Sequence, residues 1–295
     1  MARTRSEIWG TALVAAAATG WGSWALFLRG HGLSPLWQSA MILLVMGLVS
    51  LPFALRGPLR HPGRTWRGLL LLGFLDAGTG WLYFGALDRG PIAVAVLTHY
   101  LAPVVVSVVA PFYLREPLGR RTPVALVAAL FGLCLLVFSG GGLSGAALPA
   151  AILGSASALF YGGNVLVGKK LLGTVGTAQV LSFHSLVSAA LLALGAVLVR
   201  DPLPPLQAFL WLPLLGALLA GAGGGALFFH GLSLIPSQRA AVLSYLEPLV
   251  ASVVGALVFG EALGPLGLVG GALILGGGAL VALTPSEPAL SAGEG

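Results

Sequence analysis

The chain has 295 residues, of which 57% are hydrophobic and only 8% are charged, and its mean hydropathy is +0.98. A soluble protein of this size needs far more polar surface, so the composition excludes a soluble domain and predicts a protein embedded in a lipid bilayer. The formal net charge of +6 could suggest nucleic acid as a partner. However, no segment combines basic and aromatic residues on a polar surface, so no nucleic-acid binding is expected.

Ten apolar stretches are each long enough to cross the hydrocarbon core as an α-helix, which takes about 20 residues. The connections between them are short and rich in Gly, Pro, Arg or Asp, which leaves no room for a soluble domain. We therefore predict an all-α polytopic membrane protein. In chain order, its expected transmembrane helices cover residues 8–28, 35–55, 66–87, 92–114, 121–139, 148–168, 177–199, 208–231, 236–259 and 264–283.

The basic start of the chain, "MARTRSEIWG", resembles the beginning of a signal peptide. The apolar run behind it continues for a full membrane span, which predicts an uncleaved first helix. The chain has one cysteine, Cys134, inside an apolar run, so neither a disulfide framework nor a cysteine-based metal site is expected. It also lacks a nucleotide-binding loop of the G-x-x-x-x-G-K-[ST] type, so we expect neither ATP-driven pumping nor a cofactor.

Basic residues are distributed unevenly between the two sides of the predicted membrane. When the loops are assigned alternately, the side of the N-terminus receives twelve Lys and Arg residues, and the other side receives only Arg29, Arg89 and Arg200. The positive-inside rule then predicts that both termini are cytoplasmic, and an odd number of spans would scramble this asymmetry. The expected location is the plasma membrane, or the inner membrane if the source is a Gram-negative bacterium.

The chain contains an internal repeat at an offset of 145 residues. The segment "HYLAPVVVSVVAPFYLRE" at 99–116 recurs as "SYLEPLVASVVGALVFGE" at 244–261. Thirteen identities fall in the 37 positions from Leu82 to Leu118, which is more than apolar composition alone would usually produce. The repeat predicts two halves of five helices each.

The two predicted halves are residues 1–145 and 146–285, followed by a disordered cytoplasmic tail at 286–295. Because five is an odd number, the halves would enter the membrane from opposite sides. The charges agree, since the basic loops of the first half lose their charge in the corresponding loops of the second. An inverted repeat of this kind is the construction of many secondary transporters.

These features together resemble a known family. Each half has an "xYLxP…E" segment in its fourth helix and a Gly-rich fifth helix, as in the EamA-type members of the drug/metabolite transporter superfamily. The resemblance spans residues 8 to 283. It implies that spans one to four and six to nine surround a central cavity, that spans five and ten lie at the periphery, and that the transported compounds are amino acids, metabolites or drugs.

Two acidic residues fall near the middle of predicted spans. Asp76 lies in span three, and Glu247 lies in span nine, one residue before Pro248. A charged residue at bilayer depth costs about 2.5–3.5 kcal/mol on insertion scales, so such residues are expected to be functional, and we predict that both couple transport to protons. In the alternative interpretation, each acid is neutral and hydrogen-bonded to a neighbouring helix, or Glu247 caps backbone groups freed by Pro248.

Other polar and aromatic side chains within the spans could bind substrate in a cavity. Tyr100 and Tyr245 rank first because the repeat relates them. His99 and His184 could bind substrate or relay protons, and Asn164 could bind substrate or simply join helices. The other candidate substrate-binding residues are Trp21, Trp81 and Tyr83.

Two further features concern packing. Glu116 and Glu261 occur in both halves at the turn into the next helix, which predicts a structural task such as capping the N-terminus of that helix. The Gly-rich fifth and tenth spans could form the seam of a homodimer or pack tightly within one chain.

The leading hypothesis for function is a secondary active transporter that exports a small metabolite, such as an amino acid or a drug-like amphipathic compound, by alternating access coupled to protons. The alternative is an exchanger or facilitator of the same superfamily without proton coupling. A polytopic membrane enzyme acting on lipids is less favoured, because His, Asp and Glu are dispersed singly and do not cluster at one interface. We therefore do not expect an enzyme.

Overall fold

The computed structural model describes residues 4–57, 62–90, 92–138, 147–260 and 264–284. All regular secondary structure within these ranges is helical, as the composition predicted. The elements of the first half are α1 (Arg5–Gly22), α2 (Ala25–Leu28), α3 (Pro35–Ala54), α4 (Pro62–Arg89), α5 (Ile92–His99), α6 (Ala102–Tyr113) and α7 (Thr122–Phe138). Those of the second are α8 (Ala147–Leu172), α9 (Thr177–Leu198), η1 (Leu206–Phe209), α10 (Leu212–Gly216), η2 (Ala217–Gly223), α11 (Gly224–Leu234), α12 (Ser237–Leu243), α13 (Leu246–Phe259) and α14 (Pro265–Leu283). The predicted tail at 286–295 lies outside the described residues.

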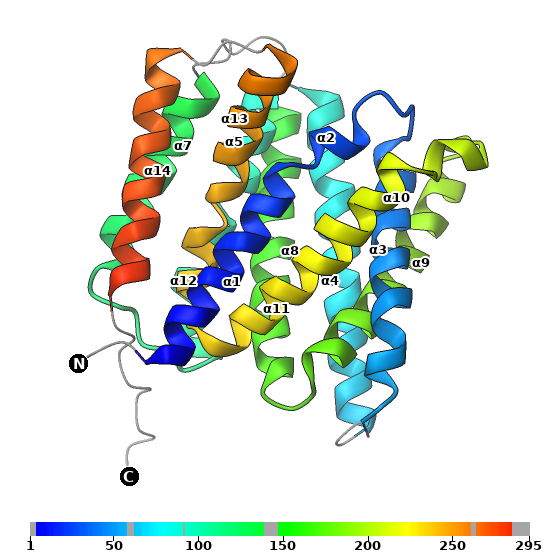
Figure 1. Cartoon of the computed structure of the whole chain (residues 1–295), viewed down its shortest axis with the longest axis horizontal. Helices are drawn as coiled ribbons and strands as arrows, with labels where there is room; N and C mark the ends of the chain where they lie inside the picture. The colour runs from blue at the N-terminus through cyan, green and yellow to red at the C-terminus, as the bar shows by residue number, and fades with distance from the viewer. Residues whose placement is uncertain (1–3, 58–61, 91, 139–146, 261–263, 285–295) are drawn as a thin grey trace.

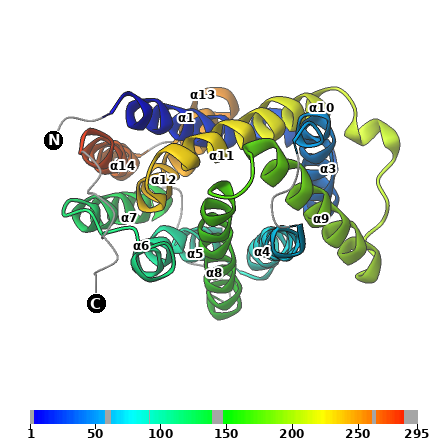
Figure 2. The same cartoon turned by 90° about the horizontal axis from the view of Figure 1, so that it is seen from below.

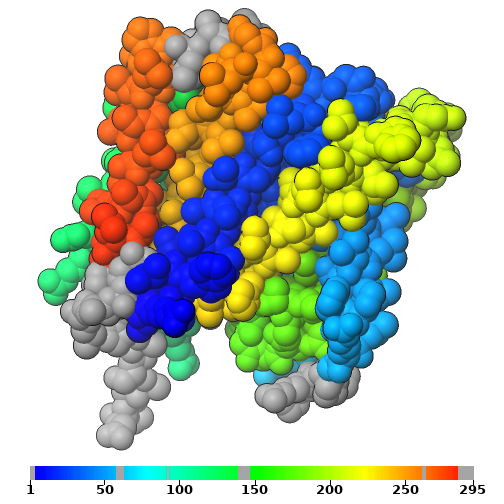
Figure 3. Space-filling model, in the orientation of Figure 1, coloured from blue at the N-terminus to red at the C-terminus, as the bar shows by residue number. Residues whose placement is uncertain are grey.

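The helices form one bundle in which the two halves are interleaved (Figures 1 and 2). The most extensive helix contacts join α3 to α9, α7 to α14, α4 to α8 and α1 to α11, and each of these pairs takes one helix from either half. On the face seen in Figure 3, α1 runs diagonally between α13 and α11. The halves therefore share one interior and do not form separate domains.

The pairing of helices follows the repeat. The second and seventh spans, α3 and α9, pack on each other, as do the fifth and tenth, α7 and α14. The third span packs on the sixth through α4 and α8, and the eighth packs on the first through α11 and α1. Exchanging the two halves leaves the contacts α3–α9 and α7–α14 unchanged and interchanges the contacts α4–α8 and α11–α1.

Among the described residues, nine segments are long and apolar enough to cross a membrane. They correspond to the expected spans except the fifth, which is α7, an apolar helix of 17 residues. The residues after α7, 139–146, lie outside the described part of the chain. Figure 1 shows that α1 begins and α14 ends at the same end of the bundle. The protein is a multi-pass membrane protein.

The fourth and ninth spans lie where the sequence predicted them, but neither is one continuous helix. The fourth is broken between α5 and α6, and the ninth is broken at the corresponding place between α12 and α13. Each break precedes a proline, Pro103 or Pro248, whose missing N–H leaves a carbonyl of the preceding turn without its usual partner. At Pro248 that carbonyl belongs to Ser244, and it accepts instead from the backbone N–H of Glu247 at 3.0 Å.

The eighth span is also irregular. It begins with the short helices η1 and α10, and it continues through the π-helical turns of η2 before α11 completes it. The π-helical sequence, "ALLAGAG", consists of small residues and two leucines, so the wide turns bring backbone close to α3. Such π-helical insertions occur frequently at functional sites.

The Gly-rich faces of α7 and α14 pack against each other within the chain. A Cβ atom on Gly132 would lie 2.5 Å from the carbonyl oxygen of Gly270, and one on Gly277 would lie 2.7 Å from that of Ala125. Only glycine permits so close an approach of two helices. A homodimer through these two helices would have to use their other faces, and it remains a prediction.

Replacing Gly270 with alanine should separate α7 from α14, because its new methyl group would meet the backbone of Gly132, which cannot move aside without displacing the helix. Overpacking of this kind costs about 1–3 kcal/mol, so we expect a lower midpoint of thermal unfolding in detergent. Gly276→Ala on the same helix is the matched control, because its Cβ would meet nothing within 4 Å. Equal unfolding midpoints for the two variants would contradict this account.

Candidate functional site

A cavity of about 170 Å³ lies inside the bundle, between helices of both halves. Its wall is made by α1, α3 and α4 from the first half and by α8, α9, η2 and α11 from the second. Aromatic and aliphatic groups form most of the lining, and a few polar groups converge on it, as in small-molecule sites generally. The lining residues that matter most for chemistry are Trp21, Asp76, Tyr161, Asn164, His184 and Phe228.

Asp76 and His184 form the polar centre of this cavity. The Oδ2 atom of Asp76 lies 3.9 Å from Nε2 of His184, and the histidine is almost completely buried. Nδ1 of His184 faces the backbone carbonyl of Val180, which can only accept, so Nδ1 carries a proton. Nε2 therefore gains a proton only when the ring becomes charged. A single proton between the two residues gives either a neutral pair or an ion pair.

Three polar atoms near this centre lack hydrogen-bond partners among the described residues: Oδ2 of Asp76, Nδ2 of Asn164 and Oγ of Ser188. Ser188 lies next to the Asp76 carboxyl without a well-formed hydrogen bond to it. Most buried polar atoms in proteins are hydrogen-bonded, because leaving one unsatisfied costs about 1–3 kcal/mol. The site thus offers an acceptor on Asp76 and a donor on Asn164 to a bound molecule.

Trp21 links the first helix to the π-helical turns. Its indole Nε1 donates to the carbonyl of Ala220 at 2.9 Å, and its ring lies 5.0 Å from that of Phe228. The hydrogen bond satisfies the polar end of the indole, so the rest of the ring can serve as an apolar wall of the cavity. This contact fixes α1 against η2 where the backbone is irregular.

A second polar cluster surrounds Glu247 at the two helix breaks. The hydroxyl of Tyr100 lies beside the Glu247 side chain. Tyr100 is also bound from the other half, because the hydroxyl of Tyr245 donates to its backbone carbonyl at 2.9 Å. That carbonyl lacks its regular helical partner, since the N–H of Val104 is bound to Leu101. The two tyrosines that the repeat relates therefore hold the two breaks together.

His99 lies among aromatic rings in this second cluster. Its ring stacks parallel to that of Tyr161, with centroids 5.4 Å apart, and lies 4.2 Å from that of Tyr83. Nδ1 of His99 lies 2.9 Å from Oγ of Ser157, whose hydroxyl donates to the Thr79 carbonyl at 2.9 Å. Because the serine proton is used in that bond, Nδ1 of His99 donates to Ser157 and its Nε2 is left as an acceptor.

Tyr161 connects the two clusters. It lines the cavity of Asp76, and its ring stacks on that of His99 in the second cluster, near the Glu247 side chain. Asp76 and Glu247 are therefore separated by polar side chains, and the region between them is not a purely apolar barrier.

The comparisons with known proteins follow the two-half organisation. The EamA-like transporter family matches residues 8–138 and again residues 148–283. The chain belongs to the EamA-like transporter family. It is 31% identical to an uncharacterized transporter of Archaeoglobus fulgidus over 91% of this chain and 94% of that protein. It is also 31% identical to Protein PecM of Dickeya dadantii over 70% of each chain.

The fold of this EamA-like transporter also matches a solved structure. The TM-score with one crystal structure is 0.78 at 25% sequence identity, and the match covers 93% of this chain and 98% of the other. Family, fold and apolar helices agree on a transporter of the drug/metabolite transporter superfamily.

The residues selected from the sequence of this EamA-like transporter fall into three places. Trp21, Asp76, Asn164 and His184 line the cavity, and Tyr83, His99, Tyr100, Tyr245 and Glu247 form the second cluster. Trp81 belongs to neither group, because it lines a separate hollow of about 460 Å³ together with Asp88, Arg89, Arg200 and Asp201. Its ring packs against Gly195, where a Cβ atom would collide with it.

The structure adds residues that the sequence did not suggest. Ser157 and Ser188 are completely buried beside His99 and Asp76, and Phe228 packs on Trp21. A serine or phenylalanine in an apolar helix carries no signal by itself, because either is common in membrane helices. Only the arrangement of the helices identifies them.

Glu116 caps a helix, as predicted, but the helix belongs to the other half. Its carboxyl accepts from the backbone N–H and the hydroxyl of Ser237, at 2.8 and 2.6 Å, in the first turn of α12. The expectation of a cap on the following helix is wrong here, because the bundle brings the start of α12 to this carboxyl. Nζ of Lys169 lies 3.8 Å from the same carboxyl. Glu261 lies outside the described residues.

Replacing Tyr245 with phenylalanine should weaken the link between the two helix breaks. The change leaves the Tyr100 carbonyl without its donor, which costs about 1–3 kcal/mol for a buried acceptor. We expect a lower midpoint of thermal unfolding in detergent. Ser252→Ala is the control, since it also removes a hydroxyl from α13 but one bonded only to the preceding turn, at Pro248. If both variants lose the same stability, the tyrosine hydroxyl does not hold the breaks together.

Proposed function

We propose that this protein is a secondary active transporter that exports a small amphipathic metabolite by alternating access coupled to protons. The observation that carries the proposal is the cavity centred on Asp76 and His184, which contains unsatisfied polar atoms and adjoins, through Tyr161 and His99, the cluster that includes Glu247. A purely structural membrane protein would have no reason to keep carboxyl groups and an open space at this depth.

The cavity favours a zwitterionic or amine-bearing substrate, such as an amino acid or a drug-like amine. The carboxyl of Asp76 can accept from an ammonium group, and the free amide hydrogens of Asn164 can donate to a carboxylate or carbonyl. The rings of Trp21 and Phe228 supply a wall for an apolar side chain. No Lys or Arg occurs among the described residues that line the cavity, which argues against a sugar-phosphate-like anion.

Proton coupling follows from competition at Asp76. The carboxyl cannot hold both a proton and a substrate ammonium ion, so binding one excludes the other. Such exclusion couples the entry of protons to the exit of substrate, which is the condition for export by antiport. Glu247, which lies beside the hydroxyl of Tyr100, is proposed as the second proton-binding group. His184 and the tyrosines between the acids are the candidates for passing the proton on.

Alternating access is supported by the packing and by the helix breaks. The contacts between the halves are exchanged by the repeat, so two related arrangements of similar energy are available, as inverted-repeat transporters require. The fourth and ninth spans are interrupted beside the second cluster, where a change in protonation could alter their packing. We propose ten spans in two inverted halves, 1–145 and 146–285, with both termini cytoplasmic in a plasma membrane.

The proposal is tested in proteoliposomes with an imposed pH gradient, after amino acids and aromatic amines have been screened for binding by their effect on thermal unfolding. Wild-type protein should accumulate the substrate against its gradient. Glu247→Gln should keep substrate exchange but lose accumulation, because an amide cannot bind and release a proton. Asp76→Asn should also weaken substrate binding about ten- to hundredfold, the range expected for a lost hydrogen bond to a charged group.

Asp88→Asn is the matched control, because Asp88 lines the separate hollow and not the cavity. It should transport like the wild type. If transport ignores the pH gradient and both intramembrane substitutions, proton coupling is wrong and the protein is an exchanger or facilitator. If Asp76→Asn changes coupling but not substrate affinity, the ammonium contact is wrong and the proton site stands.

A further inference from the structure

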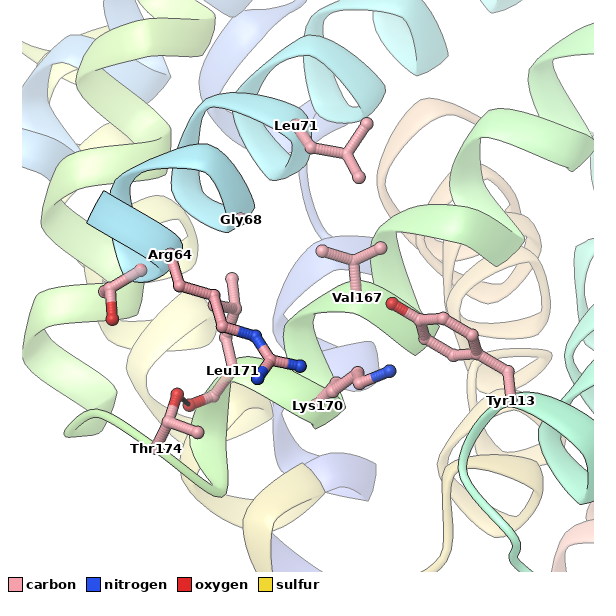
Figure 4. A pocket seen from close by; sticks show the side chains of 9 residues that line it. Arg64, Gly68, Leu71, Tyr113, Val167, Lys170, Leu171 and Thr174 are labelled. Carbon is pink, nitrogen blue, oxygen red and sulfur yellow. Dashed lines mark hydrogen bonds between the residues drawn. The ribbon is translucent and has the colours of Figure 1, made fainter. Parts of the chain in front are cut away.

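A second hollow of about 360 Å³ lies between the start of α4 and the end of α8. Its lining includes Arg64 and Gly68 from α4, Lys170 from α8, and Tyr113 from the end of α6 (Figure 4). It shares no lining residue with the cavity of Asp76. We refer to it as the α4–α8 groove.

Two positive charges face the α4–α8 groove, and the described residues offer neither of them a negative partner. Figure 4 shows the guanidinium of Arg64 and the ammonium of Lys170 extending from α4 and α8 into the same space. None of the described lining residues is acidic, and neither cation forms an ion pair within the described part of the chain. Like charges directed into one hollow repel each other, and a bound anion would remove that repulsion.

Lys169 and Lys170 are neighbours in the sequence, but their ammonium groups have different surroundings. Nζ of Lys169 is held by the carbonyls of Leu232 and Ile235, at 2.7 and 2.8 Å, and lies near Glu116. Lys169 therefore has a structural role inside the bundle. Lys170 points the other way, and its ammonium lies 4.1 Å from the centre of the Tyr113 ring, a cation–π contact that holds it over the groove.

The surroundings of the groove indicate a lipid. The groove lies at an edge of the bundle, where Figure 2 places α4 and α8, and its own residue Leu71 is 46% exposed. Phe112, beside Tyr113, is 84% exposed. Exposed apolar residues on membrane-spanning helices face acyl chains, whereas the cations belong to the first turn of α4 and the last turn of α8, where headgroups lie.

We propose that the α4–α8 groove binds the phosphate headgroup of an anionic phospholipid. Arg64 and Lys170 would contact the phosphate oxygens, and the hydroxyl of Tyr113, which points into the same space in Figure 4, can donate a further hydrogen bond. The acyl chains would lie along the apolar side chains of Leu71 and Val167. Basic pockets between transmembrane helices are known to bind such headgroups. A lipid in this groove would bridge α4, α6 and α8.

The test is native mass spectrometry of the full-length protein released from detergent, with phosphatidylglycerol or phosphatidylcholine added at matched concentrations. Wild-type protein should retain one phosphatidylglycerol in preference to phosphatidylcholine. The double variant Arg64→Gln with Lys170→Gln should bind it about 30-fold more weakly, since each cation near an anionic headgroup contributes about fivefold. Arg67→Gln is the matched control, because Arg67 lies on the same helix but does not line the groove.

Two further arms distinguish the possible outcomes. Excess inorganic phosphate should not displace the lipid; displacement would mean that the groove takes free phosphate, and the lipid proposal would be overturned. The charge-preserving variant Arg64→Lys with Lys170→Arg should retain the lipid. This result would show that the double glutamine variant loses the lipid because it lacks the two charges and not because it misfolds. Equal lipid binding by the double glutamine variant and by Arg67→Gln would also overturn the proposal.

Discussion

The whole structure depends on the requirement that every backbone polar group inside the hydrocarbon be satisfied within the protein. Regular helices meet this requirement alone, and the broken fourth and ninth spans do not. The hydroxyl of Tyr245 supplies the missing donor for the carbonyl of Tyr100, and the backbone of Glu247 supplies another for Ser244. The backbone at these two breaks thus lies in the protein interior, where it borders a polar cluster. A transporter needs such places, because a rigid helix cannot change its packing locally.

The repeat explains the framework of the molecule, and the departures from the repeat explain its chemistry. Helix pairing is preserved when the halves are exchanged, and Tyr100 and Tyr245 occupy related positions. Their surroundings differ, however. The hydroxyl of Tyr245 donates to the backbone of Tyr100, and only the second copy of the repeat carries an acid before its proline, at Glu247. A symmetric framework can take up two related conformations, and the asymmetric set of ionisable groups is the basis of the proton coupling proposed above.

Polar groups in three places of the bundle have different partners. Asp76 and His184 lie in the central cavity, Glu116 and Lys169 tie the two halves together, and Arg64 and Lys170 face the lipid-exposed groove. Lys169 and Lys170 are adjacent in α8, yet the first side chain points into the bundle and the second points out of it. Their equal charge in the sequence therefore conceals different roles.

Hydropathy, basic residues and the repeat predicted the helical class, the approximate spans and the family. These features can be recognised within single segments or by comparing the two halves of the sequence, without knowing which helices are in contact. The acids at bilayer depth could also be recognised, since an ionisable residue among apolar ones is conspicuous. The partners of these acids could not be predicted. Helices that are apolar on all sides carry no periodic signal for the face that turns inward. The pairing of Asp76 with His184, the bond from Tyr245 to Tyr100 and the separate position of Trp81 were therefore decided only by helix packing.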